Sequence, residues 1–292
     1  MGREETLDDF SKGVCRFIVG FGKKILLANN FAIIADMAFC LNKDELSVSF
    51  AWIGAIAYTL QIYFDFSGYS DMAIGLARTM GFIFPENFNH PYISQSITEF
   101  WGRWHISLSR WMRDYLYIPL GGNKVSVPRL YFNLCFVFLI SGFWHGAQWT
   151  FIFWGAYHGL FLVLDRLVLL KLTAKIGKLT RVILTFFIVV IGWIFFRSDT
   201  VGQAFQFLEK MFSFSYKEYF FENHFIFIFI IAALISFVPL FRKLGNLEYN
   251  INIQPLSVGR VAFNVLIIIV CFTICVAEIT SKGFNPFIYF KF

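Results

Sequence analysis

The sequence has few charged residues for its length. Asp, Glu, Lys and Arg make up 15% of its 292 residues, whereas hydrophobic residues make up 58%. Soluble domains carry about 25% charged residues, so this composition excludes an ordinary soluble enzyme. The net charge of +6 is not gathered in a basic run that would suit nucleic acid. We therefore predict an all-α polytopic membrane protein, with re-entrant and interfacial helices around a central cavity and with membrane lipid as its surroundings.

Several common signatures are also missing. The five cysteines have neither metal-ligand nor disulfide spacing. No histidine is followed by an aspartate in an H-x-x-x-x-D pattern, and G-x-S-x-G, H-E-x-x-H and glycine-rich phosphate loops are absent. The first dozen residues are polar and mixed in charge, unlike a signal peptide. We predict neither a bound cofactor nor a metal.

Apolar runs predict the helices of this protein. Residues 14–39 are interrupted by two lysines and two asparagines, which predicts one helix near the interface or two short ones. The polar residues that follow residue 64 predict a broken or re-entrant segment up to Gly81. Within it, Asp65 and Asp71 would orient a catalytic histidine, bind a donor, or hold helices together. Further apolar helices are expected at 50–64, 130–143, 147–164, 182–196, 225–241 and 261–277, with an interfacial helix at 201–214.

The charges in the loops predict the orientation of the helices. Residues 165–181 contain five basic side chains and one acidic side chain, while residues 198–222 contain two lysines and four acidic side chains. Positive loops stay in the cytoplasm, so the first loop is expected inside and the second outside. Alternation then places the C-terminus outside the cytoplasm.

A tryptophan-rich segment begins at Ser96, which forms a capping box with Glu99. No proline follows until Pro119, so one helix is expected. On a helical wheel its tryptophans and arginines lie on opposite faces, which is typical of an interfacial helix. His105 lies at the edge of the apolar face and is either a cavity residue or incidental. The tryptophans are Trp101, Trp104 and Trp111, and the arginines are Arg103, Arg110 and Arg113.

His145 follows an almost entirely apolar run that ends at Phe143. An ionisable residue at membrane depth generally faces a bundle interior or a water-filled cavity, which favours a functional role. The alternative is a core histidine whose ring is satisfied by a backbone carbonyl. His158 would lie roughly 20 Å from His145 on a continuous helix, too far to share a proton, and is predicted to be structural.

Four runs of the sequence resemble motifs of the membrane-bound O-acyltransferase (MBOAT) family. They are Phe66–Gly75, Phe100–Ser109, Tyr117–Gly122 and Phe143–Gly146. The resemblance is greatest to the glycan O-acetyltransferase branch that contains the membrane subunit of bacterial alginate O-acetyltransferase. That branch carries further membrane helices before the point where this sequence begins. We therefore expect residues 1–292 to form a single MBOAT-type domain without them.

The resemblance implies an enzyme that transfers an acyl group, with acetyl expected, across the bacterial inner membrane. His145 matches the catalytic histidine of the family and would act as general base, while His105 matches its second histidine. The donor would be acetyl-CoA or another thioester from the cytoplasm, and the acceptor an extracytoplasmic glycan or a partner acetyltransferase. Two alternatives remain: a transporter or channel that uses His and Asp as a proton or ion relay, and an inactive scaffold.

The last six residues, Phe287–Phe292, form an F-x-Y-x-x-F pattern around Tyr289. This ending resembles the C-terminal motif of a small partner protein in teichoic-acid D-alanylation. The resemblance implies that Tyr289 carries the acyl group covalently. An aromatic, basic tail also suits a simple interfacial anchor, so both interpretations stay open.

Overall fold

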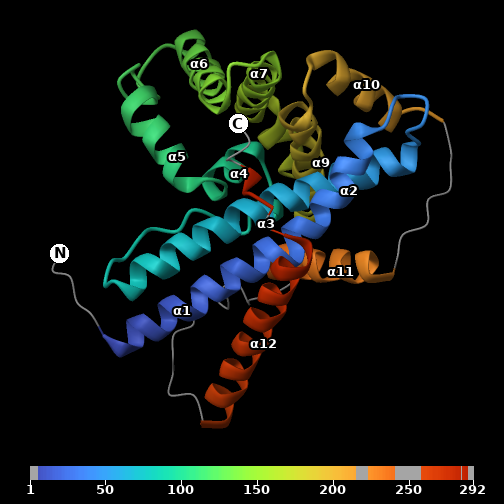
Figure 1. The fold of residues 1–292 in the computed structure, drawn as a ribbon. Helices are drawn as coiled ribbons and strands as arrows, with labels where there is room; N and C mark the ends of the chain where they lie inside the picture. The colour runs from blue at the N-terminus through green and yellow to red at the C-terminus, as the bar shows by residue number, and fades with distance from the viewer. Residues whose placement is uncertain (1–5, 215–222, 241–257, 284, 289–292) are drawn as a thin grey trace. The chain divides into compact units, whose positions relative to one another are not determined.

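The computed structural model describes residues 6–214, 223–240, 258–283 and 285–288. All regular structure in these ranges is helical, as predicted (Figure 1). The elements are α1 Leu7–Gly22, η1 Lys23–Ala28, α2 Asn29–Cys40, α3 Val48–Thr79, η2 Pro91–Ile93, α4 Ile97–Arg103, α5 Ile106–Met112, η3 Arg113–Tyr117, α6 Val127–His145, α7 Trp149–Leu164, η4 Asp165–Leu169, α8 Leu170–Thr173, α9 Lys178–Arg197, α10 Val201–Met211, α11 Asn223–Phe237, η5 Val238–Leu240 and α12 Val258–Lys282.

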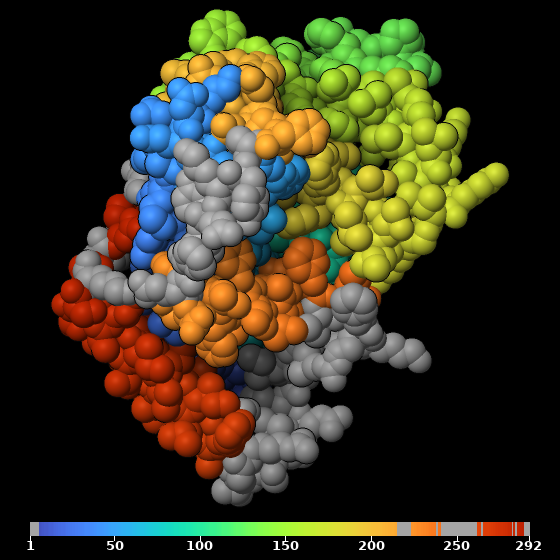
Figure 2. All heavy atoms as spheres, turned by 90° about the vertical axis from the view of Figure 1, so that its right-hand side faces the viewer, coloured from blue at the N-terminus to red at the C-terminus, as the bar shows by residue number. Residues whose placement is uncertain are grey.

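Among the described residues, four helical stretches are long and apolar enough to cross a membrane: 7–40, 127–145, 149–173 and 178–197. Two shorter apolar helices lie at 223–237 and 265–281. Figure 2 shows side chains of α12, in red, open on the face in view. Leu266 and Ile269 are more than half exposed, as expected for side chains that meet lipid. The protein is therefore a multi-pass membrane protein.

The chain packs as two compact units. Unit 1 contains residues 1–33, 60–86 and 221–291, and unit 2 contains residues 34–59 and 87–220. The division describes internal packing only. The single membrane domain expected for residues 1–292 therefore stays a prediction.

In unit 1, α1 and the second half of α3 run side by side and meet at glycines (Figure 1). A β-carbon on Gly20 would lie 2.5 Å from the carbonyl oxygen of Gly68, and one on Gly75 would lie 2.6 Å from that of Gly13. Small residues allow helix backbones to approach this closely in membranes. Because α3 is continuous through these glycines, the break predicted after residue 64 is wrong.

Ion pairs between α1, η1 and α3 account for the polar residues at membrane depth. Lys24 pairs with Asp65, and both side chains are almost fully buried. Asp71 accepts from Arg16 at 2.7 Å and from Lys23 at 2.9 Å. These charges are paired inside the protein, and the helical stretch from 7 to 40 is continuous. Of the two predicted alternatives, the structure therefore has one helix rather than two short ones. Of the three roles expected for the aspartates, the contacts are those of residues that hold helices together.

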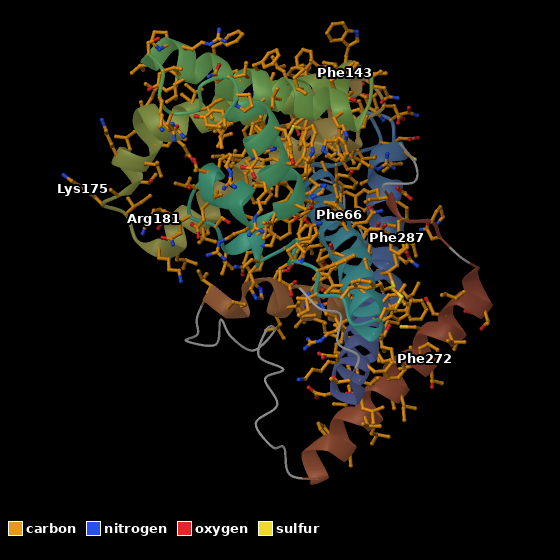
Figure 3. All side chains as sticks on the ribbon, turned by 90° about the vertical axis from the view of Figure 1, so that its left-hand side faces the viewer. Phe66, Phe143, Lys175, Arg181, Phe272 and Phe287 are labelled. Atoms are coloured by element: carbon orange, nitrogen blue, oxygen red, sulfur yellow. The ribbon has the colours of Figure 1, made fainter. Side chains whose placement is uncertain are left out.

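In unit 2, α6 and α7 form a hairpin, and α9 packs beside α7. Figure 3 labels Phe143 near the C-terminal end of α6, and Lys175 and Arg181 next to the start of α9. At the end of α9, Arg197 pairs with Asp36 at 2.7 Å and lies over the ring of Phe39. This pairing gives the charge at the end of α9 a partner inside unit 2.

Substitution of Gly20 by valine should destabilise unit 1. The added methyl groups would meet the backbone of α3, and overpacking of this kind costs about 1–3 kcal/mol. The apparent Tm in detergent should fall, measured by intrinsic fluorescence. Gly102→Ala is the matched control, because no heavy atom lies within 4 Å of a β-carbon there. Equal Tm values for the two variants would show that α1 and α3 do not depend on this contact.

Candidate functional site

The α6–α7 hairpin positions the end of α6 against α7. A β-carbon on Gly142 would overlap the carbonyl of Phe151, and one on Gly155 would overlap the carbonyl of Phe138. The two helix backbones therefore touch at this level. α6 ends at His145, and the chain turns into α7 after Gly146, where a β-carbon would lie 2.5 Å from the ring of Phe151.

His145 lies in a pocket of aromatic rings. Its side chain is 9% exposed. The ring centroid is 4.9 Å from Trp144, 5.2 Å from Trp154 in α7 and 5.1 Å from Phe196 in α9. All three rings meet the imidazole at a steep angle, so that edges contact faces. The site thus holds an imidazole at the end of a membrane helix, shielded from bulk water.

His105 breaks the tryptophan-rich segment into two helices. Its backbone has φ 45°, in the left-handed region, and it separates α4 from α5. The single helix predicted from Ser96 is therefore wrong, although Ser96 caps α4 by accepting from Glu99 N at 3.0 Å, as predicted. Histidine is among the non-glycine residues that tolerate this conformation best.

Asn87 holds the break in place. Its carbonyl oxygen accepts from Ile106 N at 3.0 Å, and its side-chain Oδ1 accepts from Ser107 N at 3.1 Å. The same Oδ1 lies 3.3 Å from Nδ1 of His105. An acceptor beside Nδ1 favours the tautomer with the proton on Nδ1, which gives the lone pair to Nε2. No sequence motif indicates Asn87, because its role depends on contacts with residues 18 to 20 positions away in the chain.

The break also changes which tryptophans face outward. Trp104 is 1% exposed and packs against Phe100 and Trp193 inside the protein, whereas Trp111 is 54% exposed. The shared outer face expected for the tryptophans is therefore wrong for Trp104. Its burial follows from its place as the last residue before the turn at His105.

The two predicted histidines both lie next to the ring of Trp144. The centroid of His105 lies 6.4 Å from that of Trp144, which also contacts His145. His145 and His105 therefore form one site in unit 2. Tyr289, the third predicted site residue, lies outside the described residues.

His158 lies closer to His145 than a continuous helix would allow. Because α6 ends at His145, α7 runs back along it, and both imidazoles lie 5.2 Å from Trp154. His158 is fully buried, and Trp101 contacts it at 5.0 Å. Among the described residues neither ring nitrogen of His158 has a hydrogen-bond partner, and neither does the indole N–H of Trp154. Because α7 turns back along α6, the separation of about 20 Å expected for a continuous helix is wrong.

A cavity of about 240 Å³ lies beside this site in unit 2. Trp101 and Ser141 line it, and Ser141 precedes His145 by one helical turn. Two basic side chains, Arg113 and Arg166, also line it, and Arg166 donates to Asn123 at 3.0 Å. The wall is otherwise mainly apolar. Such a space suits a slender ligand with an apolar body and an anionic group.

Asp165 fixes the start of α4, which forms one wall of the cavity. Its carboxylate accepts from Thr98 N at 2.8 Å and from Thr98 Oγ1 at 2.9 Å, at the N-terminus of the helix. A carboxylate there satisfies amides that have no partner within the helix. From the sequence alone, Asp165 is only an acidic side chain of the loop 165–181, because nothing nearby in the chain indicates its contact with Thr98.

The same residues can be compared with known proteins. The chain matches the membrane-bound O-acyltransferase family over residues 4–201. It belongs to this family. The match covers both histidines of the site, and it favours the enzyme over the alternative of a transporter or channel.

Three relatives illustrate the similarity. The probable alginate O-acetylase of Pseudomonas aeruginosa is 52% identical over 73% of this chain and 40% of its own length. That of Pseudomonas putida is 41% identical over 99% of this chain and 63% of its own length. The peptidoglycan O-acetyltransferase of Helicobacter pylori is 44% identical over 68% of this chain and 38% of its own length. The chain thus spans less than two thirds of the length of these relatives.

Burial lowers the pKa of His105 to about 4. An unfolded histidine titrates near pH 6.5, so between these values the unfolded chain binds more protons and stability falls as the pH decreases. His105→Asn keeps a residue that tolerates positive φ and removes the titration. The apparent Tm of this variant should therefore fall less between pH 6.5 and 4.5 than that of the wild type. Equal slopes would mean that the His105 ring is solvated in the folded protein.

Proposed function

We propose that this protein transfers an acyl group, acetyl in particular, from a thioester to a hydroxyl group. The observation that supports this most is His145, buried at the end of a membrane helix one turn from a cavity. The family of the chain is one of O-acyltransferases. The names of its relatives indicate acetylation of glycans, which makes an extracytoplasmic polysaccharide the proposed final acceptor. The proposed location is the bacterial inner membrane.

His145 acts as the general base in this proposal. Its neutral imidazole accepts the proton of the acceptor hydroxyl as the oxygen attacks the thioester carbonyl carbon. The tetrahedral intermediate collapses, the carbon–sulfur bond breaks, and the departing thiolate takes the proton from His145. The products are an ester and a thiol. Shielding by Trp154 and Phe196 limits hydrolysis by water.

His105 acts as the second histidine. With the proton on Nδ1 toward Asn87, its neutral ring keeps a fixed orientation across Trp144 from His145. It positions the reacting groups rather than taking the proton itself. The role of the break at His105 is then to direct the imidazole by means of the backbone.

The donor occupies the cavity in this proposal. Acetyl-CoA and protein-bound thioesters both present a slender arm with a phosphate at its far end. The apolar wall suits the arm, and Arg113 and Arg166 suit the phosphate. Arg166 belongs to the positive loop predicted to face the cytoplasm, which is where such donors are made.

Tyr289 serves as an intermediate acceptor. Its phenolic oxygen takes the acyl group from the thioester and an extracytoplasmic partner then removes it to the glycan. The proposal rests on the F-x-Y-x-x-F ending and on the predicted position of the C-terminus outside the cytoplasm. The competing role is that of an interfacial anchor.

His145→Ala should abolish acetyl transfer in membranes while the protein remains inserted. Loss of a general base costs about 10²- to 10⁴-fold in rate. Radiolabelled acetyl-CoA and purified glycan, with the partner proteins present, provide the assay. Phe143→Ala is the control, because this side chain ends the same helix but is 61% exposed. Normal transfer by the His145 variant would exclude it as the base, and loss of the protein from the membrane would indicate a structural histidine.

Tyr289→Phe keeps the aromatic ring but removes the nucleophile. If Tyr289 carries the acyl group, transfer to the glycan should fall to background, and tandem mass spectrometry should find the acetylated tyrosine only in the wild type. A Tyr289→Phe protein that acetylates the glycan at the wild-type rate would make the tail an anchor.

A further inference from the structure

The loop that follows η3 in unit 2 is fixed to α6 by a buried asparagine. Nδ2 of Asn133 donates to the carbonyl oxygen of Leu120 at 3.0 Å, and the side chain of Asn133 is fully buried. Gly121 and Gly122 follow with φ of 103° and 54°, values that glycine adopts without a steric penalty. The N–H of Gly122 donates to the carbonyl oxygen of Tyr117 at 2.9 Å and closes the turn. The residue after this turn therefore has a defined place beside η3.

That residue, Asn123, connects two sides of the cavity. Its Oδ1 accepts from the hydroxyl of Tyr117 at 2.8 Å and from Nη1 of Arg166 at 3.0 Å. Tyr117 and Arg166 both line the cavity, one from η3 and the other from η4. An amide oxygen has two lone pairs, so it can accept both bonds at once. Asn123 therefore fixes the direction of the Arg166 guanidinium. We call Tyr117, Asn123 and Arg166 the rim of the cavity.

The kind of acceptor decides how much positive charge the rim keeps. A carboxylate would neutralise the guanidinium, whereas an amide oxygen orients it and leaves its charge in place. Arg113, the other basic residue that lines the cavity, donates to the carboxylate of Asp114 at 2.7 Å. No carboxylate in the described part of the chain forms an ion pair with Arg166. The other N–H groups of Arg166 thus suit the oxygens of a phosphate group.

The rim lies at the opposite end of the α6–α7 hairpin from His145. A β-carbon on Gly159 would lie 3.1 Å from Cα of Cys135, so the last turns of α7 run beside the first half of α6. Arg166 follows α7 in the same direction. Leu134 and Ser141 both line the cavity, which therefore extends along α6 for roughly 10 Å toward the proposed base. A slender arm can lie in this space with a phosphate at the rim and a thioester near His145.

We propose that Asn123 is a positioning residue that directs Arg166 to the phosphate of the donor's arm. The inference rests on the proposed function, because it takes the cavity as the site of the thioester donor. Asn123 does not touch the reacting atoms in this scheme. The ligand class that the rim selects is a phosphorylated arm, phosphopantetheine, over the same arm without phosphate. A phospholipid headgroup offers the same phosphate chemistry, and the experiment distinguishes the two sources.

Affinity is measured on the full chain in dodecyl maltoside, a detergent without phosphate. Ligand-detected NMR gives Kd for phosphopantetheine and for pantetheine, and the ratio of the two is the phosphate preference. Arg166→Ala should lower this preference about ten- to a hundredfold, as expected for a hydrogen bond to a charged group, and Asn123→Ala about two- to tenfold, as for a neutral one. Arg129→Ala is the matched control and should keep the preference, because this exposed arginine lies over the ring of Phe132 and is not among the residues that line the cavity.

A double-mutant cycle separates positioning from general damage. If Asn123 acts through Arg166, Asn123→Ala should have no further effect on the phosphate preference of the Arg166→Ala protein. Loss of folding would change both Kd values together and leave their ratio unchanged. An Asn123→Ala change that lowers the preference equally with and without Arg166, or not at all, would overturn the positioning role.

Two further measurements identify the source of the phosphate and separate this inference from the proposed function. In phosphatidylcholine nanodiscs the preference should persist, and its loss there would mean that a lipid headgroup occupies the rim and would overturn the assignment to the donor. Acetyl transfer is assayed on the same proteins. Transfer by a wild type without phosphate preference would overturn the rim and leave the proposed function. A preference that depends on Arg166 and Asn123, in a wild type that transfers no acetyl, would refute the proposed function and leave the rim as a site for a phosphorylated arm.

Discussion

Backbone contact between α6 and α7 is the constraint on which the site depends. At Gly142 and Gly155 neither helix has room for a β-carbon, so the hairpin has one depth and one register. That register places Trp154 against both His145 and His158. The same approach leaves the outer side of α6 free to form the cavity with α4 and α5. The close contact between the two helices at these glycines thus determines which residues surround the proposed base.

Paired charge plays the corresponding part in unit 1. The polar residues in the helix from 7 to 40 and in α3 predict interruptions if each helix is considered alone. Together they neutralise one another: Lys24 meets Asp65, and Asp71 meets Arg16 and Lys23. Apolar helices such as α6 are predictable from the sequence, because the hydropathy of a single segment determines whether it can be buried in lipid. Complementary charges on two segments are not visible in either one.

In the candidate site, too, some features are predictable from the sequence and others depend on contacts between distant segments. His145 could be predicted from the cost of an imidazole at membrane depth, and Ser96 from its capping box. The turn at His105 could not, because Asn87 imposes it through the backbone of Ile106 and the side chain of Ser107. Nor could the neighbours of His145, since Trp154 and Phe196 come from two other helices. Motifs thus identified the chemical groups, while tertiary contacts decided what surrounds them.

The left-handed backbone at His105 also restricts how this position can vary over evolutionary time. A β-branched replacement would strain the turn and shift α5, whatever its side chain did in the site. Asparagine and glycine are the neighbours in sequence space that keep the backbone and lose the imidazole. If His105 has the role proposed for it, a relative that no longer needs the imidazole can change to either residue without disturbing this turn.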